Sequence, residues 1–223
     1  MAERGGFELC EPWLATADAA TLAARGRPRR FRRGQALMHQ GQLSGDVLLL
    51  RRGRVKVFAV AAGKEAVLAF LGPGDVLGEL SGVDHEPRSA SVVAIDAVEA
   101  LALTGAEFRA FLAETPSAAL ALLRVMSRRL RDADVKSVEF RSLGTIGRVA
   151  VRLLELSERF GRDDSGTVVI ELPLSQEDLA GWTGSSVESV SRGLHSMRSL
   201  GWIETRRREI RIMDVEAVRN LTV

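Results

Sequence analysis

Short apolar runs separated by turns fill residues 31–104. The runs occupy 47–50, 55–58, 66–70, 91–95 and 98–103. Turn signals lie between them, including Arg33-Gly34-Gln35 and Gly72-Pro73-Gly74-Asp75. Many short strands at such a spacing are typical of an all-β barrel or jelly roll. We therefore expect the first half of the chain to fold mainly as β-sheet.

From Thr104 the pattern becomes helical. A short element is predicted over 107–114, and Pro116 opens a long helix that continues toward Phe140 without Gly or Pro. Residues recur along it at intervals of three and four, namely Leu123, Met126, Leu130, Ala133, Ser137 and Phe140. This spacing predicts a two-stranded coiled coil and hence a parallel homodimer. The alternative is that this row of residues packs on the chain's own β-domain.

A second amphipathic helix is predicted to begin near Ile146, after the break at Gly144. We place the last domain boundary there and expect a turn at 163–166, followed by a strand over 167–172. The resulting plan has three parts: a β-domain at 1–115, a dimerisation helix at 116–141 and a C-terminal domain at 142–223. A chain of 223 residues with 46% apolar content is long enough for two domains.

Residues 174–184 carry the signals of a short helix followed by a tight turn. Ser175 can cap this helix, because Asp178 stands at its third position. The small Ala180 allows two helices to cross closely, and Gly184 supplies the turn between them. A helix-turn-helix requires this combination.

A second helix is predicted from Ser185 or Ser186 to about Leu200. One face carries a carboxylate, hydroxyl, guanidinium and apolar contact suited to base edges in the major groove: Glu188, Ser191, Arg192 and Val187. Glu188 has an alternative role, because it could complete a capping box with Ser185. Gly193 in mid-helix is expected to cost about 1 kcal/mol relative to Ala.

Residues 202–205 and 209–213 alternate like a β-hairpin whose tip holds Arg206, Arg207 and Arg208. Such a hairpin resembles the wing of winged-helix proteins. Its arginines could contact DNA phosphates, which would make affinity sensitive to salt. They could equally be a solvated tip.

The stretch from Gly78 to Ala90 brings together an acid, a base, a hydroxyl and turn glycines. A phosphate favours a guanidinium with backbone N–H donors, and a carboxylate can accept a bond from a ribose hydroxyl. Arg88 and Glu79 suit these two roles. The alternative is an ordinary loop in which Arg88 pairs with Glu86.

This stretch resembles the phosphate-binding cassette of the catabolite-activator/FNR family, with its Gly-Glu-Leu opening and Arg-Ser-Ala close. Residues 187–192 resemble the Val-Glu-Thr-Ile-Ser-Arg segment of the FNR-type subgroup. The resemblance implies an α+β protein with a β-roll for a cyclic nucleotide, a dimerisation helix and a winged helix-turn-helix. It assigns to the nucleotide Gly78, Glu79, Leu80, Arg88, Ser89, Ala90, Ala133 and Asp134. It assigns to DNA Ser175, Ser186, Val187, Glu188, Ser191, Arg192, Arg206, Arg207 and Arg208.

In the catabolite activator a Thr-Ser pair on the dimer helix contacts the adenine, and Ala133 and Asp134 occupy those positions here. A carboxylate at 134 accepts hydrogen bonds from adenine or guanine. We expect cyclic AMP, with cyclic GMP a close second, as an allosteric ligand. By the resemblance, the partners are double-stranded DNA with TTGAT-type half-sites in an inverted repeat, a second copy of the chain, and RNA polymerase.

Composition limits the remaining classes. Cys10 is the one cysteine, which excludes an intrachain disulfide and a four-cysteine iron–sulfur cluster. The net charge of +2 does not itself indicate a nucleic-acid partner. We expect a cytoplasmic protein without membrane attachment, metal or enzymatic activity. Three alternatives stay open. The same DNA-binding scaffold could sense another ligand such as haem, with His85 as its ligand residue, or it could act without any ligand. The chain could also be a cupin-like metal enzyme using His39, His85 and Glu79.

Overall fold

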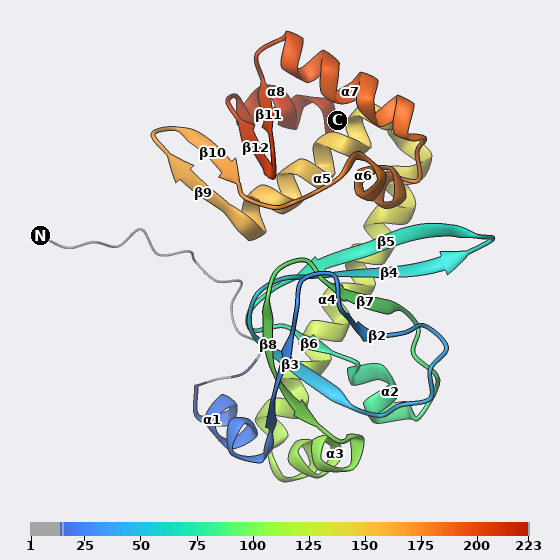
Figure 1. The fold of residues 1–223 in the computed structure, drawn as a ribbon, viewed down its shortest axis with the longest axis vertical. Coiled ribbons are helices and arrows are strands. Elements are labelled where there is room, and N and C mark those ends of the chain that lie inside the picture. Colours follow the sequence, from blue (N-terminus) through green and yellow to red (C-terminus); the bar gives the residue numbers. More distant parts are fainter. Residues whose placement is uncertain (1–13, 15, 223) are drawn as a thin grey trace, which may run out of the picture. The chain divides into compact units, whose positions relative to one another are not determined.

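In the computed structural model the chain divides into two compact units between Asp132 and Ala133. The structure describes Leu14 and residues 16–222 (Figure 1). A long helix, α4 (Pro116–Ser142), contributes to both units.

The N-terminal unit contains two four-stranded antiparallel sheets, ordered β1-β8-β3-β6 and β2-β7-β4-β5. The strands are β1 (Arg27–Phe31), β2 (Ala36–Met38), β3 (Val47–Arg52), β4 (Val55–Ala61), β5 (Lys64–Leu71), β6 (Val76–Leu77), β7 (Ser91–Ala94) and β8 (Val98–Leu103). The predicted β-roll is therefore confirmed, and every apolar run named from the sequence forms a strand.

Strand β3 shows why an unbroken apolar run forms a strand here. Successive side chains point to opposite faces of a sheet. Leu48 and Leu50 enter the core between the two sheets. Val47 and Leu49 enter a second core with residues of the helices α1 (Thr16–Arg25), α3 (Gly105–Glu114) and α4. Both faces of β3 are covered, so alternation of polar and apolar residues is absent.

Helix α4 buries one side and leaves another exposed. Ala118 and Leu122 are buried, and Met126 packs against the same core. Leu123 and Leu130 are 61% and 66% exposed. The alternative that the whole stripe packs on the β-domain therefore holds for Met126 and fails for these two leucines.

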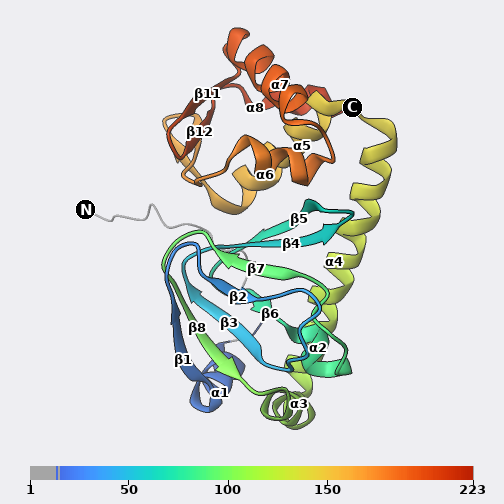
Figure 2. The same cartoon turned by 45° about the vertical axis from the view of Figure 1, so that its right-hand side comes forward.

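The C-terminal unit packs α5 (Thr145–Phe160) against the other helices and a small sheet (Figure 2). The helices are α6 (Gln176–Thr183), α7 (Val187–Ser199) and α8 (Val215–Arg219). The sheet order is β11-β12-β10-β9, from β9 (Gly161–Asp164), β10 (Thr167–Ile170), β11 (Ile203–Arg206) and β12 (Glu209–Ile212). A 3₁₀ turn follows at Asn220–Thr222. The predicted winged helix-turn-helix is confirmed.

Gly193 does not interrupt α7. It is buried where α7 crosses α5, and a Cβ built there would lie 3.7 Å from Ile146, an ordinary van der Waals distance. Gly193 therefore does not prevent α7 from packing on α5. Within the described residues, no helix combines the length and apolar character needed to cross a bilayer.

Candidate functional site

Gly78 begins the predicted phosphate cassette in the left-handed conformation, with φ 75°. A side chain there would meet the Arg88 guanidinium and would approach the Asp46 carbonyl oxygen to 2.7 Å. Glycine is therefore required for two reasons, the backbone conformation and the close passage of Arg88. The chain then enters the short helix α2 (Glu79–Asp84).

Arg88 is 5% exposed, and its guanidinium is held by neutral oxygens. One terminal nitrogen donates to the Gly78 carbonyl at 2.9 Å. The other donates to Ser44 Oγ at 3.2 Å and to the Asp46 carbonyl at 2.5 Å. Nε has no acceptor among the described residues. The alternative pairing with Glu86 is therefore wrong, because these oxygens take the guanidinium instead.

Burial lowers the pKa of Arg88, while the carboxylates of Asp46 and Glu79 act in the opposite direction. An arginine side chain remains protonated in proteins. A buried cation whose hydrogen-bond partners are carbonyl and hydroxyl oxygens favours an anionic ligand, because burying a charge without a counter-ion is costly.

Glu79 is the second buried charge of this site, 4% exposed. Its carboxylate accepts a bond of 2.7 Å from Arg129 on α4. Arg129 also donates to the carbonyl of Val76 at 2.9 Å. The cassette is thus joined directly to the long helix by an ion pair.

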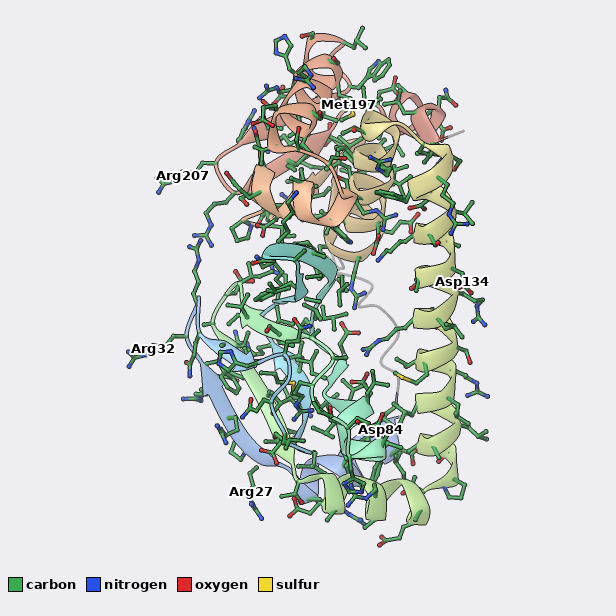
Figure 3. The ribbon with its side chains drawn as sticks, turned by 90° about the vertical axis from the view of Figure 1, so that its right-hand side faces the viewer. Arg27, Arg32, Asp84, Asp134, Met197 and Arg207 are labelled. Carbon is green, nitrogen blue, oxygen red and sulfur yellow. The ribbon has the colours of Figure 1, made fainter. Side chains whose placement is uncertain are left out.

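The remaining predicted ligand residues differ in exposure. Leu80 and Ser89 are exposed and Ala90 is half-buried. Ala133 and Asp134 are exposed residues of α4, and Figure 3 shows Asp134 projecting from that helix. The structure gives Asp134 no hydrogen bond or ion pair within the described part of the chain, so its contact with a base stays a prediction.

Three residues of the site were not predicted from the sequence: Ser44, Asp46 and Arg129. Ser44 and Asp46 are 44 and 42 positions from Arg88, and Asp46 contributes its backbone carbonyl. Neither contact has a local sequence signal. Arg129 lies 50 positions from Glu79, so its ion pair has no local sequence signal either.

The proposed cupin-like trio does not assemble into a metal site. His39 and His85 are exposed, whereas Glu79 is buried and ion-paired. Over residues 16–222 and Leu14, no three His, Cys, Asp or Glu side chains form a group suited to a metal.

The helix-turn-helix is built as the sequence predicts. Ser175 Oγ accepts the Asp178 N–H at 3.0 Å, and the Asp178 carboxylate accepts the Ser175 N–H at 3.0 Å. Gly184 ends α6 with φ 59°, and a Cβ there would come within 2.8 Å of the Phe140 ring. These contacts fix the turn between α6 and α7.

The cap of α7 is Ser186, whose Oγ accepts the Ser189 N–H at 3.2 Å. The capping-box alternative for Glu188 with Ser185 is therefore wrong, since Glu188 is only the second helical residue. Hydrogen bonds from its own backbone N–H and from the Ser186 hydroxyl lower the pKa of Glu188. Its carboxylate is thus held ionised and exposed at the start of α7.

The rest of the predicted reading face lies along the first turns of α7. Val187 and Ser191 are half-buried, and Arg192 is exposed. The Arg192 guanidinium donates to Ser189 Oγ at 2.9 Å and lies near enough to Glu188 to favour its ionised form. An acceptor and a cationic donor therefore occupy one exposed helix face, as base reading requires.

The hairpin β11–β12 presents its arginines at the tip. Arg206 pairs with Glu204 at 2.9 Å, and Arg208 adopts a left-handed backbone conformation with φ 67°. Arg207 extends outward from the tip (Figure 3). Arg198 on α7 donates to Thr205 at 2.9 Å and ties the hairpin to the helix.

A β-roll with a buried arginine, followed by a winged helix-turn-helix with an exposed polar helix face, is the architecture of a DNA-binding transcription regulator. Family models match both halves: a cyclic nucleotide-binding domain over 28–115 and a Crp-like helix-turn-helix domain over 147–221.

Relatives match most of the chain. A CRP-like cAMP-activated global transcriptional regulator of Mycobacterium tuberculosis is 32% identical over 217 residues, covering 97% of this chain and 95% of its own. The cyclic AMP receptor protein of Thermus thermophilus is 34% identical over 174 residues, or 78% and 77% of the two chains. FixK2 of Bradyrhizobium japonicum shares the fold with a TM-score of 0.78 at 21% identity, covering 89% and 98%. The chain belongs to the CRP/FNR family of transcription regulators and is not an enzyme.

Proposed function

We propose that this regulator is a homodimer controlled by a cyclic purine nucleotide, with cyclic AMP favoured and cyclic GMP a close second. This proposal rests on Arg88, whose guanidinium is 5% exposed and donates its hydrogen bonds to neutral oxygens of Gly78, Ser44 and Asp46. A cyclic phosphate would supply an anion that bonds directly to this guanidinium. The names of two relatives, one cAMP-activated and one a cyclic AMP receptor, support the same ligand class.

Within this proposal the segments keep the predicted roles: 1–115 binds the nucleotide, 116–141 dimerises and 142–223 binds DNA. Arg88 and Ser89 bind the phosphate, Glu79 accepts the ribose hydroxyl, and Gly78, Leu80 and Ala90 shape the cassette. Glu79 has a second oxygen besides the one bonded to Arg129, so it can serve both groups.

The Arg129–Glu79 ion pair connects the ligand site to α4. A ligand that hydrogen-bonds to Glu79 changes the environment of a carboxylate bonded to that helix. A ligand shifts a conformational equilibrium only by its difference in affinity for the two states. We propose that the state whose Arg129–Glu79 geometry suits the ribose is the DNA-binding state.

The exposed leucines of α4 support dimerisation through that helix. Leu123 and Leu130 stand seven positions apart and are both largely exposed in the single chain. Two α4 helices packed along this stripe would bury them. Ala133 and Asp134 would then stand one turn beyond Leu130, where Asp134 can accept hydrogen bonds from a purine base.

On DNA, Arg192 would read guanine and Ser191 would lie near thymine, with Glu188 accepting from cytosine and Val187 contacting a methyl group. Ser175, Ser186 and Arg206–Arg208 would contact phosphates. The half-site is proposed to be of the TTGAT type, in an inverted repeat matching the dimer. RNA polymerase is the proposed protein partner.

The deciding experiment is titration calorimetry of the full-length protein with cyclic AMP and cyclic GMP, followed by DNA affinity with and without each. Tight binding of one nucleotide, and tighter DNA binding in its presence, are expected. If neither binds, or if DNA affinity does not respond, control by a cyclic nucleotide is wrong. The variant Asp134→Ala tests the base contact: unchanged affinity for both nucleotides would remove Asp134 from the site.

A further inference from the structure

The loop between β2 and β3 runs alongside Arg88 and bonds to it at several points. The backbone N–H of Gly41 donates to the Arg88 carbonyl at 2.8 Å, and the Arg88 N–H donates to the Gln42 carbonyl at 3.0 Å. Further along the loop, Ser44 and Asp46 supply two of the three oxygens that accept bonds from the guanidinium. One loop therefore determines both where the backbone of Arg88 lies and what its side chain contacts.

The two oxygens from this loop share one nitrogen of the guanidinium. Nη2 donates to Ser44 Oγ and to the Asp46 carbonyl, which uses both of its N–H bonds, whereas Nη1 donates to the Gly78 carbonyl. A guanidinium binds a phosphate most strongly through two parallel N–H bonds. Such a pair joins Nη2 either to Nε or to Nη1, so Nη2 takes part in each. A phosphate can therefore bind Arg88 in this two-bond geometry only if one loop oxygen leaves Nη2.

The Ser44 hydroxyl is the easier of the two oxygens to displace. Its bond to Nη2 measures 3.2 Å, at the upper end of the normal range, whereas the bond to the Asp46 carbonyl measures 2.5 Å. The Asp46 carbonyl is a backbone group directly before β3, where Val47 and Leu48 are buried in the core. The Ser44 hydroxyl can instead move away by rotation about a single side-chain torsion.

We propose that Ser44 regulates the nucleotide site by occupying the position on Arg88 that the phosphate takes. Before a nucleotide binds, the hydroxyl accepts a bond from Nη2 and offsets part of the cost of burying the guanidinium. Binding exchanges this bond for one to a phosphate oxygen, so the free energy of the Ser44–Arg88 bond opposes binding. Ser44 thereby raises the nucleotide concentration at which the regulator responds. This inference rests on the proposed binding of a cyclic nucleotide at Arg88.

The test variant is Ser44→Ala, which removes the hydroxyl and keeps the backbone of the loop. We expect it to bind cyclic AMP or cyclic GMP about tenfold more tightly than wild type, because one hydrogen bond to a charged group changes an equilibrium constant by about tenfold or more. Ser44→Thr keeps a hydroxyl and is expected to restore the wild-type affinity. Titration calorimetry of the full-length protein measures the dissociation constants of all three proteins.

Ser91→Ala is the matched control. Ser91 Oγ accepts the Gln40 N–H at 2.9 Å, so it holds the same loop without a bond to Arg88. We expect Ser91→Ala to bind the nucleotide with wild-type affinity. Thermal unfolding without nucleotide shows how far each substitution changes the stability of the protein.

The outcomes distinguish competition at Arg88 from nucleotide binding itself. Weaker or unchanged binding by Ser44→Ala would overturn the competition and leave nucleotide binding intact. Equal gains in Ser44→Ala and Ser91→Ala would assign the effect to a loosened loop and would also overturn it. If wild type binds neither nucleotide but Ser44→Ala binds one, the competition is supported in its strongest form. If neither protein binds either nucleotide, the proposed function and this inference are both wrong.

Discussion

The two binding regions of this protein place their charges in opposite ways. In the N-terminal unit Arg88 and Glu79 are 5% and 4% exposed, and each is held by specific partners. On α7, Glu188 and Arg192 are exposed at the start of a helix. A buried charge suits one small ligand of fixed shape, and salt screens it weakly. Exposed charges suit an extended polyanion whose binding depends on salt.

The largest expected effect follows from the buried arginine. Arg88→Gln should weaken cyclic nucleotide binding about a thousandfold, because hydrogen bonds to a charged group contribute about 1.5–3 kcal/mol each and a phosphate would accept two. Calorimetry at two salt concentrations measures this loss, which should hardly change with salt. Arg109→Gln is the matched control, since Arg109 also donates to a carbonyl, that of Gly82. If Arg88→Gln bound the nucleotide with wild-type affinity, the buried arginine would not be a ligand-binding residue.

A buried arginine in the C-terminal unit can be used to test whether burial determines how much a charged side chain contributes to the free energy of unfolding. Arg152 is 3% exposed, pairs with Glu139 and Glu155, and lies over the Trp182 ring. Arg152→Met leaves these carboxylates without their buried cation and should cost about 3 kcal/mol of unfolding free energy, measured in urea.

Arg162→Met is the control for this prediction. Arg162 pairs with Glu171 at 3.8 Å, and both side chains are about half exposed or more. We expect a change below about 1 kcal/mol, as for surface pairs in general. Similar costs for the two variants would show that burial does not separate them.

Arg192 and Arg207 are both exposed, yet they are expected to act differently on DNA. Arg192→Gln should cost about 1–3 kcal/mol on the selected site and relax preference for guanine at one position. Arg207→Gln should weaken all sequences alike and reduce the salt slope by about 1. Binding to a panel of single-base variants at several salt concentrations separates the two. If both variants lose affinity uniformly, Arg192 does not read a base.

The smallest expected effect concerns the recognition helix itself. Gly193→Ala should stabilise the protein by up to about 1 kcal/mol, because a Cβ would make only ordinary contacts with Ile146. Gly184→Ala should destabilise it, since Gly184 has φ 59° and a Cβ would approach the Phe140 ring to 2.8 Å. Thermal unfolding of both variants shows whether each substitution raises or lowers the stability of the protein. A destabilising Gly193→Ala would indicate tighter packing of α7 on α5.

Features that depend on neighbours in sequence were predicted well. The Ser175–Asp178 capping box and the Gly184 turn each need residues only a few positions apart, and both form as expected. Strands such as β3 and β4 follow from apolar runs and turns in the same way, whereas β1 (Arg27–Phe31) and β9 (Gly161–Asp164) have no apolar run and were not predicted. The cap of α7 was left open between Ser185 and Ser186, and the structure chose Ser186.

Contacts across the fold were not predictable in the same way. Ser44 and the Asp46 carbonyl meet Arg88 because β3 and the cassette are brought together by sheet pairing. Along α4, Met126 packs on the β-domain whereas Leu123 and Leu130 are exposed, because only one side of the helix faces the core. The apolar spacing alone suited both a coiled coil and a contact with the β-domain.

Residue order alone determined the succession of β-roll, long helix and winged helix-turn-helix, together with the exposed polar face of α7 that we propose reads DNA. It did so because hydrophobic period, caps and turn glycines act over a few residues. Only the folded chain decided that Arg88 is enclosed by neutral oxygens and that Arg129 bonds to Glu79. Those arrangements join residues distant in sequence, and burial converts them from separate side chains into sites.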